Sequence, residues 1–124
     1  MTKMKVQYFT DKEEAFVNLL IGIGIPRTTA KVLVYLVNTP EATSHDIERG
    51  ADLRQPEVSI AIQSLKEQGW ITCRQARTES IGRPENVVSL SRPVSEIIEL
   101  IRTEKEGEIR KKMALAQKIR DYIP

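Results

Sequence analysis

The stretch LRQPEVSIAIQSLKEQGWI, residues 53–71, decides the fold. Val58, Ile62 and Leu65 recur at spacings of four and three residues, which predicts one buried stripe on an α-helix. Gly69 stands where helices commonly end, and the following WITCRQ alternates enough to predict a strand. At about 100° per residue, the side opposite the stripe carries Pro56, Ile60, Gln63 and Glu67, flanked by Glu57 and Ser59. This outward face has an isoleucine and almost no positive charge.

Three helices are predicted before this one. The first begins among acids at Asp11 and ends at Gly22 and Gly24, and the second runs from Pro26 to just before Pro40. The third is short, with Thr43 and Asp46 spaced as a near capping box, and ends at Gly50. About five residues separate it from the quoted helix, which is the spacing of a helix-turn-helix.

The remainder predicts a hairpin and a long helix. ARTESIGRPE is rich in turn residues and NVVSL is typical of a returning strand. From Pro93 the chain favours helix almost to its end, and Gly107 is where a bend would come. The predicted class is therefore mainly α with a small β-hairpin. It comprises a winged helix-turn-helix domain over 11–92 and a C-terminal dimerisation helix over 93–124.

Length and composition narrow the class of protein. The 124 residues suffice for one core, and 40% hydrophobic with 29% charged residues is typical of a globular protein. The net charge of +2 permits a nucleic-acid partner without requiring one. The single cysteine, Cys73, cannot form a disulfide within the chain, which favours the reducing cytoplasm as the location of the protein. The longest apolar run, LLIGIGI at 19–25, is shorter than the ~20 residues of a membrane span, so no membrane is expected.

Two further stretches resemble a known family. IGIPRTTAKVLVYL at 23–36 and GRPENVVSLS at 82–91, together with the quoted helix, resemble the DNA-binding domain of archaeal TrmB-type regulators and, more distantly, MarR-type regulators. The likeness covers roughly residues 15–92 and implies a fourth helix that reads DNA, followed by a wing. Ile60 departs from the Arg or His common in such helices, and Thr29 replaces the usual Glu. Only 32 residues follow Arg92, too few for the sugar-sensing domain of full-length relatives.

The outward helix face has the chemistry for reading bases. Gln pairs well with adenine, Ser with several bases, and an apolar side chain with the thymine methyl group. We therefore predict that these residues, together with Arg54 and Glu57, contact DNA from the recognition helix. The predicted contacts are Arg54, Gln55, Glu57, Ser59, Ile60 and Gln63. From Asp52 to Glu67 the acids outnumber the bases three to two, so positive charge for the phosphates must come from elsewhere. The predicted wing and backbone contacts are Ser44, Arg74, Arg77 and Arg83.

Other interpretations of this surface stay open. The polar positions are equally typical of a solvated helix face, and hairpin arginines also protect sheet edges. Ile60 and Glu57 favour a rival function, a winged-helix module that docks a protein of the transcription machinery. A third possibility is a regulator with an added ligand or redox switch.

The terminal helix has an apolar stripe of its own. Its members are Ile109, Met113, Ala116, Ile119 and Ile123. Residues 94–108 contain five acids and 109–123 five bases, an order that complements the helix dipole. An antiparallel second copy would bury the stripe and pair these charges, so a homodimer is predicted.

No catalytic or cofactor site is predicted. GIGIP at 22–26 lacks the third glycine of a nucleotide loop and is better explained as a helix end and turn. His45 and Cys73 have neither a metal-ligand set nor a nucleophile–base partner nearby in the sequence. The carboxylates show no paired acid and base. The expectation is a protein that is not an enzyme and carries no metal or cofactor.

Overall fold

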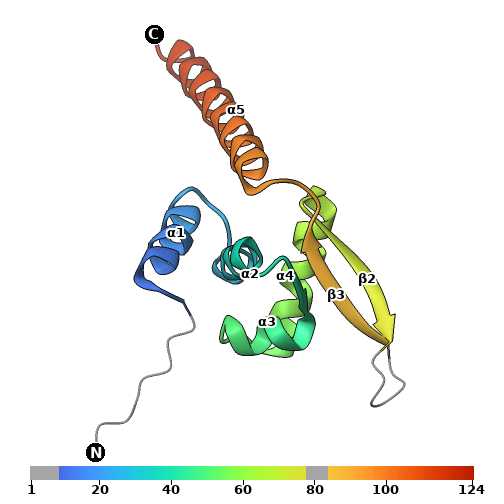
Figure 1. Ribbon diagram of the computed structural model, residues 1–124. Helices are drawn as coiled ribbons and strands as arrows, with labels where there is room; N and C mark the ends of the chain where they lie inside the picture. Colours follow the sequence, from blue (N-terminus) through green and yellow to red (C-terminus); the bar gives the residue numbers. More distant parts are fainter. Residues whose placement is uncertain (1–8, 78–83) are drawn as a thin grey trace, which may run out of the picture. The chain divides into compact units, whose positions relative to one another are not determined.

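A computed structural model describes residues 9–77 and 84–124 of the chain (Figure 1). In order, its elements are α1 (Asp11–Gly22), α2 (Arg27–Asn38), β1 (Glu41–Thr43), α3 (Ser44–Gly50), α4 (Gln55–Gln68), β2 (Ile71–Arg77), β3 (Pro84–Leu90) and α5 (Val94–Asp121). The predicted class, mainly helical with a small sheet, is confirmed. The chain divides into two compact units at Pro93.

The core of the first unit is built around α2. Residues on most sides of this helix are at most 1% exposed, namely Ala30, Val32, Leu33, Val34 and Leu36. From α4 the core receives Val58, Ala61 and Leu65, each at most 1% exposed. The buried stripe of α4 thus includes Ala61, whereas Ile62, which we expected in it, is only half-buried. That rotation leaves the side of α4 bearing Ile60 and Gln63 in solvent.

Side chains fix the ends of the short helices. Thr43 Oγ1 accepts from the Asp46 backbone N–H at 3.0 Å, and the Asp46 carboxylate accepts from the Thr43 N–H at 3.1 Å. This reciprocal capping box confirms the predicted start of α3. An equivalent box, which we did not predict, joins Thr10 and Glu13 at the start of α1. Gly69 ends α4 at φ 79°, a left-handed conformation that glycine adopts without steric cost.

The sheet has one strand more than the predicted hairpin. Its order is β1-β3-β2, and both pairings are antiparallel. Val88 of β3 pairs with Ala42 of β1 on one side and with Cys73 of β2 on the other, and is fully buried. The short strand β1 leads directly into α3. Strand β1 therefore connects the start of the helix-turn-helix, formed by α3 and α4, to the wing, formed by β2 and β3.

The turn between α3 and α4 is tightly constrained. Asp52 has φ 55°, the one positive φ at a non-glycine residue in the described part of the chain. The Leu53 backbone N–H donates to the Glu48 carbonyl at 2.9 Å, and the Ala51 N–H donates to the Ile47 carbonyl at 2.8 Å. These bonds set the direction in which α4 leaves the turn.

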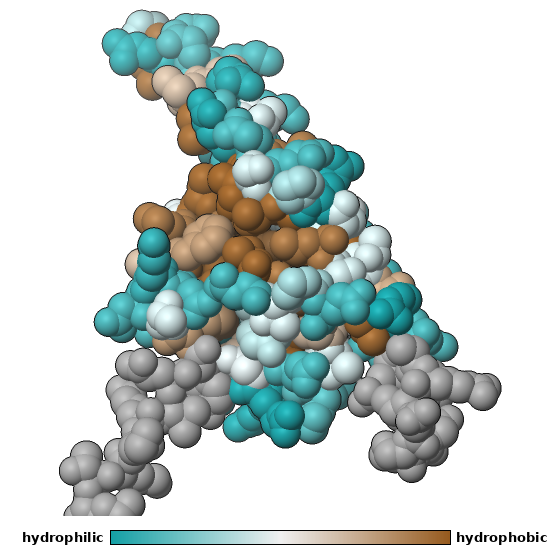
Figure 2. Space-filling model, in the orientation of Figure 1, coloured by the Kyte–Doolittle hydropathy of each residue, from teal (hydrophilic) through white to brown (hydrophobic). Residues whose placement is uncertain are grey.

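The second unit consists of α5, a continuous helix of 28 residues that runs through Gly107. Its acidic half contains ion pairs along the helix, from Arg102 to Glu99 and Glu106, and from Lys105 to Glu108. Hydrophobic residues interrupt the hydrophilic surface of this helix in Figure 2. The largest exposures among the hydrophobic residues of α5 are those of Met113 (68%) and Ile119 (66%).

Candidate nucleic-acid interface

The outward face of α4 carries the six residues predicted to read bases. All of them are exposed: Arg54, Gln55, Glu57, Ser59, Ile60 and Gln63. Ile60 is 69% exposed although it lies between the buried Val58 and Ala61. Ile60 also borders a shallow surface depression with Ser59, Gln63, Ser64 and Glu67. The helix thus presents an apolar side chain in a ring of polar ones.

Local hydrogen bonds organise this face. Gln55 Nε2 donates to Ser59 Oγ at 3.1 Å, and Gln63 Nε2 donates to Glu67 Oε2 at 3.1 Å. Glu57 Oε1 accepts from the Arg54 backbone N–H at 2.9 Å, in the first turn of the helix. A carboxylate there satisfies a free N–H and complements the helix dipole. Glu57, one of the two acids on the outward side of the helix, is therefore a helix cap.

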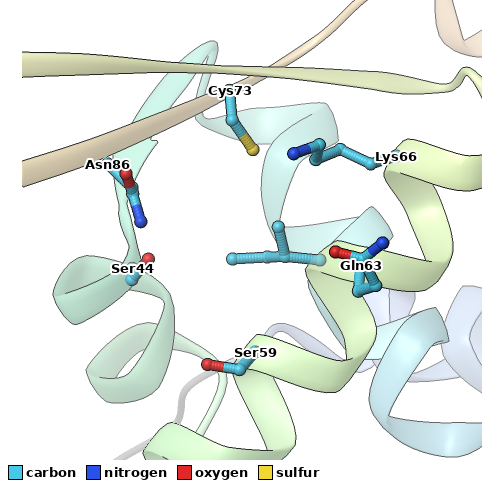
Figure 3. Close-up of a pocket in the computed structure, with 7 residues that line it drawn as sticks. Ser44, Ser59, Gln63, Lys66, Cys73 and Asn86 are labelled. Atoms are coloured by element: carbon cyan, nitrogen blue, oxygen red, sulfur yellow. The ribbon is translucent and has the colours of Figure 1, made fainter.

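Beside this face a polar groove separates α4 from the wing (Figure 3). Its volume is about 270 Å³. The lining residues are Ser44 of α3, Ser59, Ile62, Gln63 and Lys66 of α4, Cys73 of β2 and Asn86 of β3. Ser44, Ser59 and Gln63 were predicted from the sequence, whereas Lys66 and Asn86 were missed. Lys66 lies one turn after Ile62, and this spacing was the signal for it in the sequence. Whether Lys66 faces the wing depends on the rotation of α4, which the structure shows.

The wing arginines differ in what surrounds them. Arg74 Nη2 is 3.2 Å from both carboxylate oxygens of Glu41 on β1. Both side chains are 58% exposed, so the guanidinium remains accessible while its charge is partly balanced. Arg77 is the last residue of β2, in register with Pro84. Arg83 lies outside the described residues.

The residues predicted to mediate dimerisation are all exposed, four of them on α5 and Ile123 just after its end. They are Ile109 (57%), Met113 (68%), Ala116, Ile119 (66%) and Ile123 (69%). All of them except Ile109 line one shallow depression together with Gln117 and Arg120. The helix thus has a continuous apolar strip over its last four turns.

Metal-binding side chains do not gather into a site within the described ranges. No cluster of three His, Cys, Asp or Glu side chains there could hold a metal ion. Cys73 is a half-buried free thiol. Among the residues in view, no helix is long and apolar enough to cross a membrane.

Comparisons with known proteins agree with this architecture. The family model of the MarR family matches residues 23–79. No curated protein sequence matches the chain. A possible transcriptional regulator from Methanosarcina mazei Go1 superposes with TM-score 0.62 and 12% identity, over 86% of each chain. The archaeal chromatin protein TrmBL2 superposes with TM-score 0.68 and 14% identity, over 90% of this chain but 40% of TrmBL2.

A third solved structure is that of overoxidized AbfR bound to DNA, with TM-score 0.50, 19% identity, and coverage of 90% of this chain and 84% of AbfR. At such identities the superpositions establish the fold. The fold is the winged-helix fold. The order of helices, the three-stranded sheet and the superpositions lead to one conclusion: the chain has a winged helix-turn-helix fold, and its residues 23–79 match the model of the MarR family.

Proposed function

We propose that this protein is a cytoplasmic, sequence-specific regulator of transcription that binds double-stranded DNA as a homodimer. Helix α4 lies in the major groove, and the wing contacts the backbone or the minor groove. The observation that carries the proposal is the exposed face of α4, where two glutamines, a serine and an isoleucine project beside the polar groove. These side chains match base edges and the thymine methyl group.

The distribution of charge supports a division of roles between helix and wing. Recognition of a base sequence requires hydrogen bonds to base edges, whereas affinity for DNA comes largely from neutralisation of its phosphates. Glu57, the one acid in the first turn of α4, caps the helix. Its carboxylate is therefore held at the start of the helix, away from the later turns that would contact bases. Arg54 at the start of α4 and Arg74 of the wing supply exposed guanidinium groups on either side.

The dimer is supported by α5. Its apolar strip would stay in water in a single chain, at a cost of about 25 cal/mol per Å² of apolar surface. The five bases of 109–123 form no ion pair with any residue of 9–77 or 84–124. A second copy can cover the apolar strip with its own strip, and its acidic residues 94–108 are possible partners for bases that extend past that contact. A two-fold axis would set two α4 helices on half-sites about 10 base pairs apart, so an inverted repeat is the expected target.

Titration against DNA from upstream of the protein's own gene, at several salt concentrations, tests the proposal. A DNA-binding protein loses affinity steeply as salt rises, because bound counterions are released on binding. Arg74→Ala and Arg77→Ala should each weaken binding to all duplexes alike.

The rival function is a winged-helix module that docks another protein through Ile60. The exposure of Ile60 is the observation in its favour. If no duplex is bound at low salt, that outcome contradicts DNA binding and supports the rival.

A further inference from the structure

We infer that the groove between α4 and the wing is a phosphate-binding site, with Lys66 as its cation and Ser44 and Asn86 as its hydrogen-bond donors. The inference rests on the proposed function and names contacts outside the reading face. The ligand is a phosphate group, which on duplex DNA is a phosphodiester of the strand that passes between helix and wing.

The convergence of donors is the first argument. Figure 3 shows the Lys66 ammonium, the Asn86 amide and the Ser44 hydroxyl directed toward one space from three separate elements. Ser59 and Gln63 complete its polar wall. None of the lining residues is acidic. Such a set suits an anion, because every polar side chain in it can donate a hydrogen bond.

The three donors have no other partner in the part of the chain that the structure describes. Across the described ranges, Lys66 forms no ion pair, and the side chains of Lys66, Ser44 and Asn86 make no hydrogen bond. Their neighbours on the same face are engaged, since Gln55 bonds Ser59 and Gln63 bonds Glu67. An unpaired ammonium in a groove without acids is a ready counter-charge for a phosphate.

The groove also has a size and a position that suit a phosphate of the DNA backbone. The groove, at about 270 Å³, has room for a phosphate group. The groove adjoins the reading face, because Ser59 and Gln63 line both. A strand whose bases meet Gln63 would therefore have its backbone within reach of Lys66.

The test compares Lys66→Gln with Lys12→Gln, an identical charge change at an exposed position of α1. Duplex binding is titrated over a range of salt, using upstream DNA and a random duplex. For Lys66→Gln we expect about tenfold weaker binding of both duplexes at low salt, and a slope of log K against log salt smaller by about one. Lys66→Arg should keep the wild-type slope, and Lys12→Gln should match wild type.

A second arm titrates inorganic phosphate into the protein and follows the amide resonances of Ser44 and Asn86 by NMR. Saturable shifts that Lys66→Gln abolishes, with an unchanged duplex slope, would assign the site to free phosphate. Wild-type protein that binds phosphate in this way but no duplex would refute the proposed function and leave the site standing. If Lys66→Gln changes neither the duplex slope nor the phosphate shifts, the site does not exist.

Discussion

At the scale of single residues, Gly50 has less room for a side chain than Gly22, Gly69 or Gly107. A Cβ built there would overlap the ring of Tyr35 on α2. Gly50→Ala should therefore push α3 away from α2 and lower the free energy of unfolding by about 1–3 kcal/mol, as overpacking does. Urea denaturation followed by circular dichroism measures the change.

Gly22 at the end of α1 is the matched control, because a Cβ there meets nothing within 4 Å. Gly22→Ala should leave the free energy of unfolding unchanged or raise it, by at most ~1 kcal/mol, since alanine favours helix. Equal losses for the two variants would show that Gly50 and Tyr35 are not in close contact.

Gln63 is the residue with which the account explains sequence preference. Its amide lies exposed on α4, held along the helix by its bond to Glu67. Gln63→Ala should weaken binding to the preferred site by about 1–3 kcal/mol and leave binding to random duplex unchanged. Competition binding against both duplexes checks this. A uniform loss on all sequences would instead identify Gln63 as a backbone contact.

At the scale of elements, the ion pair between β1 and β2 partly balances the charge of the wing. Glu41→Gln should release Arg74 and strengthen duplex binding severalfold at low salt, an effect that fades as salt rises. Stability should change by less than about 1 kcal/mol, because both partners are exposed. Binding and thermal unfolding are measured on the same samples.

Glu14→Gln on α1 provides the same charge change at an exposed residue remote in sequence from the wing. It should raise affinity less than Glu41→Gln does. If the two variants behave alike, only the net charge of the protein matters, and Arg74 has no special part in binding.

The helices were predictable because their signals are local. Capping residues, glycines and the apolar spacing of three and four residues placed α1 to α4 close to their observed bounds. Strand β1 was not predictable, because Glu41–Thr43 is too short for any period and its hydrogen bonds join β3 some 46 residues later. The pairing of Arg74 with Glu41 depends on that strand and was missed for the same reason.

The candidate site, too, was predictable only where its signals are local. The outward residues of α4 follow from helical geometry, so the sequence alone placed them on one face. The groove requires three elements that are distant in the chain, and its members Lys66 and Asn86 look like ordinary surface residues in the sequence. Only the tertiary structure brings them together.

At the scale of the whole molecule, the proposed dimer depends on the apolar strip of α5. Met113→Glu places a charge in that strip and should shift the protein to monomer at micromolar concentration, measured by sedimentation equilibrium. Leu115→Glu is the control: Leu115 is 58% exposed, and two residues further along it is rotated by about 200° from Met113. Dimers of unchanged affinity in both variants would place the interface elsewhere.

The account as a whole depends on the outward face of α4 meeting DNA. Site-specific photocrosslinking tests this directly, with benzoylphenylalanine at position 60 and, as a control of similar exposure, at position 19 of α1 (69% and 74% exposed in the native residues). With upstream duplex present, the probe at position 60 should crosslink to DNA and the probe at position 19 should not. A probe at position 60 that crosslinks to protein alone, while the duplex is bound, would contradict the central claim.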